Sequence, residues 1–181
     1  MKITKLLCVI PLAVLLCFTF ACQNKAEKAE LEKFRTQAKV EEQNKGIARD
    51  LFKAIDEGNA EQILAFLADD FALTAPGIIE PLGRDMLPQL RNAHYKAFPD
   101  WRHFIEDVIA DGDKVVVKLI QKGTHEAEYE GIPATGVKAT MPAMHLLTIV
   151  DGKIKEMFAI EDYLGLNQQL GMELRPKEAK K

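Results

Sequence analysis

A predicted β-hairpin near the C-terminus constrains the fold more than any other stretch of the chain. Asp151-Gly152 separates two long runs rich in apolar residues, 137–150 and 153–163. Asp-Gly in this setting favours a two-residue type I′ turn, because that turn needs positive φ at both central residues. A turn of two residues also fixes which residues face each other, and therefore which side chains share a face of the sheet.

Counted from this turn, one face of the hairpin is mostly apolar but carries three ionisable side chains. The predicted register pairs Leu147 with Glu156, His145 with Phe158, and Met141 with Asp162. An apolar sheet face with a few titratable groups is typical of a small-molecule pocket or an acid–base site. The alternative is a structural core, with His145, Glu156 and Asp162 at its polar rim.

Length and composition predict one globular domain with additional segments. The chain has 181 residues, of which 48% are hydrophobic and 28% charged. Its net charge is only −3, so we expect no nucleic-acid partner.

The N-terminus has the pattern of an export signal. Two lysines, an apolar run over residues 6–20 and Ala21-Cys22 predict a signal peptide over residues 1–21. Residues 19–22 (TFAC) resemble the lipobox of bacterial lipoproteins. The three cysteines are Cys8, Cys17 and Cys22, so cleavage before Cys22 leaves one cysteine and no intrachain disulfide. We therefore expect a lipid on Cys22 that anchors the protein to a membrane; the alternative is an ordinary residue near a conventional cleavage site.

The remaining segments follow from composition. Gln23 after the cysteine resembles the sorting signal for the outer membrane, so in a Gram-negative cell the domain would face the periplasm. Residues 22–42 contain the anchor site and a charged linker, which is either a solvated helical spacer or a disordered tether. The folded domain is predicted over residues 43–172, and residues 173–181 are expected to be a disordered tail.

The domain is predicted to belong to the α+β class. Apolar residues at helical spacing predict a helix that ends before Gly58, a short helix capped by Asn59, and a third helix over residues 84–98. Strands are expected at 71–75, 104–110 and 114–122, before the hairpin, and a last helix at 164–170. About three N-terminal helices are thus available to cover one face of a curved antiparallel sheet.

An ordered set of short motifs supports a family resemblance. In chain order these are AFPD at 97–100, EDV at 106–108, GTH at 123–125, GIPATG at 131–136, DGKI at 151–154 and DYLGLNQQLG at 162–171. Together they resemble the SnoaL-like polyketide cyclase (ester cyclase) family over residues 41–172. The resemblance implies the NTF2-like fold, a cone-shaped sheet with an internal pocket, and a homodimer as the expected assembly.

The resemblance also implies an activity and its residues. The family's founding reaction is an intramolecular aldol ring closure of a polyketide methyl ester, which needs no metal or cofactor. By resemblance Asp162 would be the base and His145 would assist, since a carboxylate in an apolar cavity has its pKa raised towards the range of a general base. In the predicted register Asp162 lies roughly 13 Å from His145 on a flat sheet, so Glu156 is kept as a third candidate. A ligand-binding lipoprotein without turnover remains the alternative, and in both cases the ligand is a small apolar compound.

Further side chains are candidates for the pocket. We expect Trp101, Phe158, Tyr95 and Met141 in its wall; the alternative for the aromatic residues, which their type favours, is an ordinary aromatic core. His125 either points into the pocket mouth or bonds to the loop over residues 131–136. The four histidines are scattered, without metal-ligand spacing. The chain contains no serine, so a serine nucleophile is excluded.

Overall fold

The protein was analysed as a computed structural model, which describes residues 3–173 and 175, with side-chain surroundings from residue 25 onward. It divides into two compact units, Met1–Val40 and Glu41–Lys181, and helix α1 (Ile3–Glu57) contributes to both. The signal peptide over residues 1–21, the lipid site at Cys22 and most of the predicted tail lie outside the residues described in this detail, so they stay predictions. Within the described part of the chain, no helix is both long and apolar enough to cross a membrane.

The helices end close to where the sequence indicates, although α1 begins at Ile3, far before the predicted start of the domain. Helix α1 ends at Glu57, before Gly58, whose φ of 72° few other residues tolerate. Helix α2 (Ala60–Phe66) is capped by the Asn59 side chain, which accepts a hydrogen bond from the Gln62 N–H at 3.0 Å. Helix α3 (Met86–Ala97) and helix α4 (Tyr163–Gln169) complete the set. The residues predicted as a charged linker continue α1, and those from 25 to 40 are exposed.

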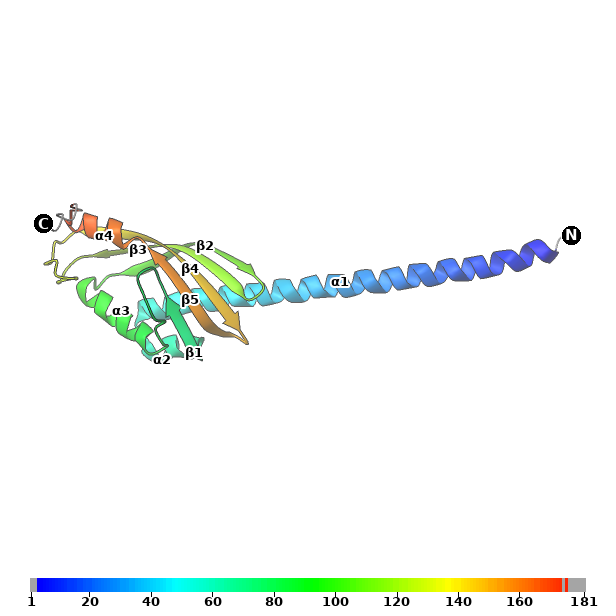
Figure 1. Cartoon of the computed structure of the whole chain (residues 1–181), viewed down its shortest axis with the longest axis horizontal. Coiled ribbons are helices and arrows are strands. Elements are labelled where there is room, and N and C mark those ends of the chain that lie inside the picture. The colour runs from blue at the N-terminus through cyan, green and yellow to red at the C-terminus, as the bar shows by residue number, and fades with distance from the viewer. Residues whose placement is uncertain (1–2, 174, 176–181) are drawn as a thin grey trace, which may run out of the picture. The chain divides into compact units, whose positions relative to one another are not determined.

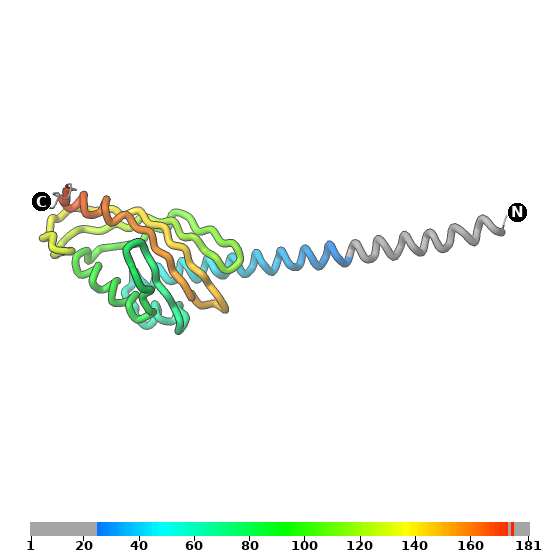
Figure 2. Tube along the Cα trace, in the orientation of Figure 1, coloured from blue at the N-terminus to red at the C-terminus, as the bar shows by residue number. Residues whose placement is uncertain are grey.

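Five strands form one curved sheet, so the predicted α+β class is confirmed (Figure 1). The strands are β1 (Leu67–Thr74), β2 (Arg102–Asp111), β3 (Lys114–Thr124), β4 (Lys138–Val150) and β5 (Lys153–Glu161), in the order β1-β5-β4-β3-β2. Strands β2 to β5 form an antiparallel meander, whereas β1 adds to the edge of β5 in parallel. Figure 2 shows β1 running beside β5, from which it is far apart in sequence. The sheet is therefore mixed rather than wholly antiparallel.

The helices cover one face of this sheet. Leu51 and Phe52 of α1, Ile63 of α2 and Leu87 of α3 are buried in one cluster with inward side chains of the sheet, such as Leu147. A second apolar cluster, around Trp101, lies where β4 meets α3 and α4. The inner face of the sheet thus carries two apolar clusters, both packed against helices.

The predicted hairpin register is right at the turn and wrong beyond it. Val150 pairs with Lys153 and Ile149 with Ile154, as counted from Asp151-Gly152. A bulge then inserts one extra residue, Lys155, so that Thr148 pairs with Glu156, Leu147 with Met157, and His145 with Ala159. Because side chains alternate across a strand, a slip of one residue sends every later side chain of β5 to the opposite face.

Candidate functional site

The bulge brings Glu161, rather than Glu156 or Asp162, to the inner face of the sheet. Glu161 is the last residue of β5 and pairs with Ala143 of β4. Its Oε1 lies 3.3 Å from Nε2 of His145, and both side chains are almost fully buried. The contact is electrostatic rather than an aligned hydrogen bond, and neither ring nitrogen of His145 has a hydrogen-bond partner. A buried carboxylate therefore stands beside a buried imidazole whose Nδ1 is bare.

A relay of hydrogen bonds holds the Glu161 carboxylate. Gln121 of β3 donates from Nε2 to Glu161 Oε1 at 3.0 Å, and Trp101 Nε1 donates to Gln121 Oε1 at 2.8 Å. Since the indole N–H can only donate, it fixes the orientation of the Gln121 amide and directs its NH₂ group at Glu161. Gly123 makes room for this indole, because a Cβ there would lie 2.5 Å from Trp101 Cε3.

These neighbours keep Glu161 ionised. Burial alone raises the pKa of Glu161, but His145, the Tyr163 hydroxyl and the Gln121 amide all favour the carboxylate and together lower its pKa to about 2. Conversely, burial and the nearby Glu161 charge raise the pKa of Tyr163. Glu161 is thus a permanent anion at neutral pH, suited to orienting and stabilising a protonated imidazole.

A neutral histidine, His94 of α3, belongs to the same interior. Burial lowers the pKa of His94 to about 4, against the opposing effect of the Glu161 charge and with a small further lowering from His103. Its ring stacks on Phe98 and meets Trp101 and Tyr129 edge-on. The Nε2 atom of His94 is buried without a hydrogen-bond partner. A neutral imidazole with an unused nitrogen can donate to a developing oxyanion.

A second carboxylate–imidazole pair lies nearby. His103 Nδ1 is 2.6 Å from Asp56 Oδ1, and the Tyr95 hydroxyl donates to the same oxygen at 2.7 Å. Burial raises the pKa of Asp56, but these contacts outweigh it and lower the pKa below its usual value. The Phe52 ring is 5.2 Å from both the His103 and the His145 rings. The two pairs thus flank one phenyl ring.

Three predicted site residues are not where the hairpin count placed them. Asp162 is exposed, and its carboxylate accepts the Gly165 N–H at 2.8 Å as the N-cap of α4. Glu156 is exposed and accepts from the Thr148 hydroxyl at 2.7 Å. Phe158 lies on the outer face of the sheet. The predicted inward orientation of these side chains is wrong, because the count omitted the bulge at Lys155.

The other candidates do lie on the inner side. His145 is buried as expected, and Trp101, Tyr95 and Met141 belong to the second apolar cluster. His125 is fully buried, stacks on Phe98, and its Nδ1 lies 3.1 Å from the Thr135 hydroxyl. It therefore makes the contact to the 131–136 loop that one of the two alternatives expected.

Sequence reasoning missed Glu161, Gln121, His94 and Asp56. One signal could have identified Glu161: the adjacent charges Lys155-Glu156 between apolar residues cannot both face solvent in a regular strand, and therefore indicate a bulge. Nothing in the local sequence marks the other three.

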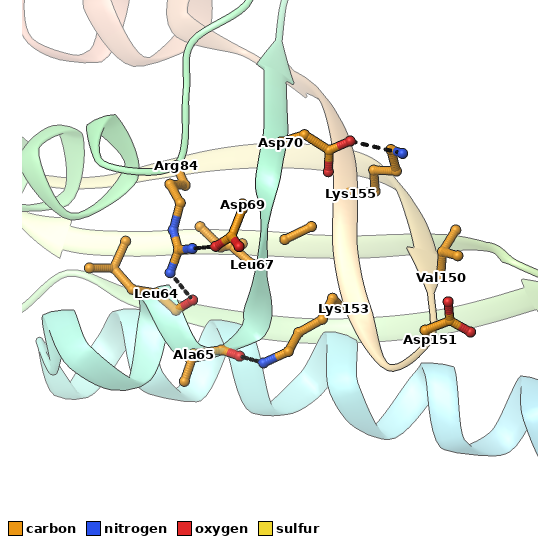
Figure 3. Close-up of a pocket in the computed structure, with 11 residues that line it drawn as sticks. Leu64, Ala65, Leu67, Asp69, Asp70, Arg84, Val150, Asp151, Lys153 and Lys155 are labelled. Atoms are coloured by element: carbon orange, nitrogen blue, oxygen red, sulfur yellow. Dashed lines mark hydrogen bonds and ion pairs between the residues drawn. The ribbon is translucent and has the colours of Figure 1, made fainter.

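A separate surface hollow of about 420 Å³ lies near the turn end of β5 (Figure 3). Five of its six charged side chains are already paired: Arg84 with Asp69, Lys155 with Asp70 at 2.9 Å, and Lys153 with the Ala65 carbonyl. It contains no buried acid–base group, unlike the interior around Glu161 at the other end of β5. Among the described residues, no three His, Cys, Asp or Glu side chains are grouped closely enough to hold a metal ion.

Comparison with known proteins shows that this domain is similar to described cyclases. The family model of the SnoaL-like polyketide cyclases matches residues 46–170. Aklanonic acid methyl ester cyclase DauD of Streptomyces sp. strain C5 is 29% identical over 135 residues, which are 69% of this chain and 80% of the relative. Aklanonic acid methyl ester cyclase DnrD of Streptomyces peucetius is 40% identical over 76 residues, 41% of this chain and 52% of the relative.

Solved structures show the same fold. IdmH of Streptomyces antibioticus, a proposed polyketide cyclase, superimposes with a TM-score of 0.66 at 26% identity, over 71% of this chain and 99% of that one. A SnoaL-like protein from Jannaschia sp. CCS1 gives a TM-score of 0.67 at 21% identity, over 75% and 96% of the two chains. The predicted NTF2-like fold is therefore confirmed.

Proposed function

The chain belongs to the SnoaL-like polyketide cyclase family, and we propose that it performs proton-transfer chemistry, without a cofactor, on a small apolar carbonyl or ester compound at the Glu161–His145 pair. The observation that supports this most is the buried carboxylate 3.3 Å from an imidazole whose Nδ1 has no partner. An unpaired polar atom inside a protein is costly, so its retention favours a functional use.

The roles follow from the charge states. Glu161, with its pKa lowered to about 2, is a poor proton acceptor at neutral pH. His145 is therefore the proton acceptor in this proposal: its Nε2 lies beside the Glu161 carboxylate, and its Nδ1, which has no partner, takes the proton. These roles are the ones found in other carboxylate–histidine pairs, where the carboxylate orients the imidazole and stabilises its charged form.

The reaction we propose is an aldol-type closure. His145 Nδ1 removes a proton from the carbon next to a carbonyl group, and the C–H electron pair forms an enolate. That carbon attacks a second carbonyl of the same molecule, a C–C bond forms, and the resulting alkoxide takes the proton back from His145. Substrate and product are isomers, so no other reactant is needed. His94, neutral because burial lowers its pKa to about 4, can donate from Nε2 to the enolate oxygen.

Entry of a ligand requires local opening. Trp101, Met141 and His145 are each at most 5% exposed, so a compound reaches Nδ1 only after neighbouring side chains move. The alternative function, ligand binding without turnover, would use the same interior with no proton transfer.

The test is α-proton exchange on bound compounds. A set of small keto esters, such as methyl levulinate, is screened by thermal shift against the chain from Gln23 onward, because bound compounds raise the apparent stability. Those that bind are then followed by proton NMR in D₂O. We expect the wild type to accelerate exchange, and His145→Gln to abolish it.

Two matched controls test whether the exchange depends on the interior pair or on the carboxylates that were predicted from the sequence. Asp162→Asn retains a good helix cap and Glu156→Gln changes an exposed carboxylate, so both should leave exchange unchanged. If Asp162→Asn abolishes exchange while His145→Gln retains it, the assignment is wrong. If compounds bind and none exchanges faster than in buffer, the ligand-binding alternative replaces the enzyme.

A further inference from the structure

Asp56 and His103 form a second acid–base pair that the proposed ring closure does not use. That closure takes one proton from carbon and returns it, so the Glu161–His145 pair is sufficient for it. Asp56 and His103 are nevertheless in close contact: Oδ1 lies 2.6 Å from Nδ1, and Oδ2 accepts the backbone N–H of His103 at 3.2 Å. Only 8% of the His103 side chain is exposed. A largely buried pair outside the proposed steps therefore needs a role of its own.

The position of Asp56 favours a role that needs its charge. Asp56 lies in the last turn of α1, where the helix dipole disfavours an anion. An asparagine there could accept the same bonds from the Tyr95 hydroxyl and the His103 backbone without this cost. A carboxylate beside an imidazole, in contrast, orients the ring and stabilises its charged form. Asp56 thus prepares His103 to donate a proton.

The donor atom is Nε2 of His103, because Nδ1 faces Asp56. Among the residues that the structure describes, none bonds to this nitrogen. His103 pairs with Gln121 of β3, whose side chain donates to Glu161. Directly opposed residues of an antiparallel pair share one face of the sheet. His103 therefore belongs to the same interior as Glu161.

The two imidazoles are close enough to act on one molecule. The ring of Phe52 lies 5.2 Å from the ring of His103 and 5.2 Å from that of His145, so the two imidazole centres are at most twice that distance apart. A carbon–carbon–oxygen unit that lies about 3 Å from a nitrogen at each end spans roughly 8 Å, which is within this limit. A compound that lies against Phe52 is therefore within reach of both histidines.

We propose that this interior also eliminates water from β-hydroxy ketones, with His145 as the base and His103 as the acid. This inference rests on the proposed role of His145. Elimination of water needs two groups at once, because one proton leaves a carbon atom while another joins the departing hydroxyl group. β-Hydroxy ketones are also the class of compound that an aldol closure forms, so the product of the first reaction is a substrate for the second.

The elimination is balanced without any other reactant. Nδ1 of His145 removes a proton from the carbon next to the carbonyl group, and the C–H electron pair forms a C=C bond to the neighbouring carbon. The C–O bond of that carbon breaks, and its electron pair takes a proton from Nε2 of His103. The products are a conjugated enone and water. After they leave, the proton on His145 passes through solvent to His103, which restores both rings.

The experiment follows two reactions of one compound, the β-hydroxy ketone formed from benzaldehyde and acetone. It is incubated in D₂O with the chain from Gln23 onward, which contains the whole unit Glu41–Lys181. Proton NMR then measures α-proton exchange and the new alkene signals of the enone in the same sample. We expect the wild type to accelerate both reactions above their rates in buffer, and His145→Gln to lose both.

Two variants test the second pair directly. His103→Asn keeps a side-chain N–H near the position of Nδ1 but removes Nε2, so the ratio of alkene formation to exchange should fall by about 100-fold or more, as for loss of a general acid. Asp56→Asn removes the charge beside the imidazole and should lower the same ratio. Glu106→Gln, a change of an exposed carboxylate on the same strand as His103, is the matched control and should keep the wild-type ratio.

The outcomes separate this inference from the proposed function. If the wild type exchanges the α-protons but forms no enone faster than buffer does, the elimination is wrong and the role of His145 stands. If the wild type does neither, the proposed function fails, and the elimination fails with it. A ratio that His103→Asn leaves unchanged shows that the Asp56–His103 pair is structural and also overturns the inference. The wild-type measurement does not depend on the folding of any variant.

Discussion

Glu161 should make the stability of the fold depend on acid in a way that one substitution removes. In the folded chain its pKa is lowered from 4.5 to about 2, whereas in the unfolded chain it should have the ordinary value. As the pH falls, the unfolded state therefore takes up this proton first. The carboxylate contributes stability that is fully present above about pH 4.5 and is lost as the pH falls towards 2.

The size of the effect follows from the shift. The lowering of the Glu161 pKa from 4.5 to about 2, at about 1.36 kcal/mol for each pH unit, corresponds to roughly 3 kcal/mol of unfolding free energy. Glu161 is almost completely buried, so solvent screening reduces this value little. Asp56 also has a lowered pKa and adds to the loss in acid, but it does so equally in every variant that retains it.

The assay is urea unfolding at a series of pH values between 6 and 2 for the wild type, Glu161→Gln and Glu156→Gln. Glu161→Gln should be less stable than the wild type at pH 6, because it breaks a buried pair. Between pH 6 and pH 2, however, its unfolding free energy should fall by about 3 kcal/mol less than that of the wild type. Glu156→Gln changes an exposed carboxylate and should follow the wild-type slope closely. If Glu161→Gln loses stability as steeply as the wild type, Glu161 is not the buried anion inferred here.

Three further predictions test the parts of the structure that position this pair. Trp101→Phe removes the N–H that Gln121 accepts and should cost about 1–3 kcal/mol in urea unfolding. Asp162→Ala removes the cap of α4 and should cost about 1 kcal/mol, whereas Asp162→Asn should cost almost nothing by the same measurement. Deleting Lys155 removes the bulge but keeps the pairing of the residues after it, so Glu161 still faces inward. The proton NMR signals of His145 should therefore change little. The deletion also removes an exposed ion pair with Asp70, which should lower the free energy of unfolding by at most about 1 kcal/mol.

The helix ends and the hairpin turn could be predicted from the sequence because the signals for them are local. Gly58 ends α1, Asn59 caps α2, and Asp151-Gly152 forms the hairpin turn, each through the conformation of one or two residues. The parallel placement of β1 beside β5 was not predictable in the same way. It depends on packing between segments more than 80 residues apart, for which no residue of either strand carries a signal.

The interior site was predicted only in part, for a related reason. His145 precedes the turn on β4, where the count of alternate residues holds, and it was placed correctly. Gln121, His94 and Asp56 come from three other elements, and their convergence is a property of the closed structure. Their side chains are individually unremarkable in sequence, since a glutamine on a strand or a histidine on a helix usually has no special role.

The Lys155 bulge decides which acid can act. In a regular hairpin β5 would direct Glu156 and Phe158 inward and leave Glu161 in solvent, opposite to what is found. The inward residues of β5 after the bulge are Met157, Ala159 and Glu161. Ala159 is small and lies directly across from His145, and the Glu161 carboxylate lies diagonal to it. Ala159 leaves room beside the imidazole, and Glu161 reaches Nε2 from the next inward position. Beyond the bulge, the apolar residues Phe158 and Ile160 therefore face outward, whereas the charge of Glu161 is directed into the interior.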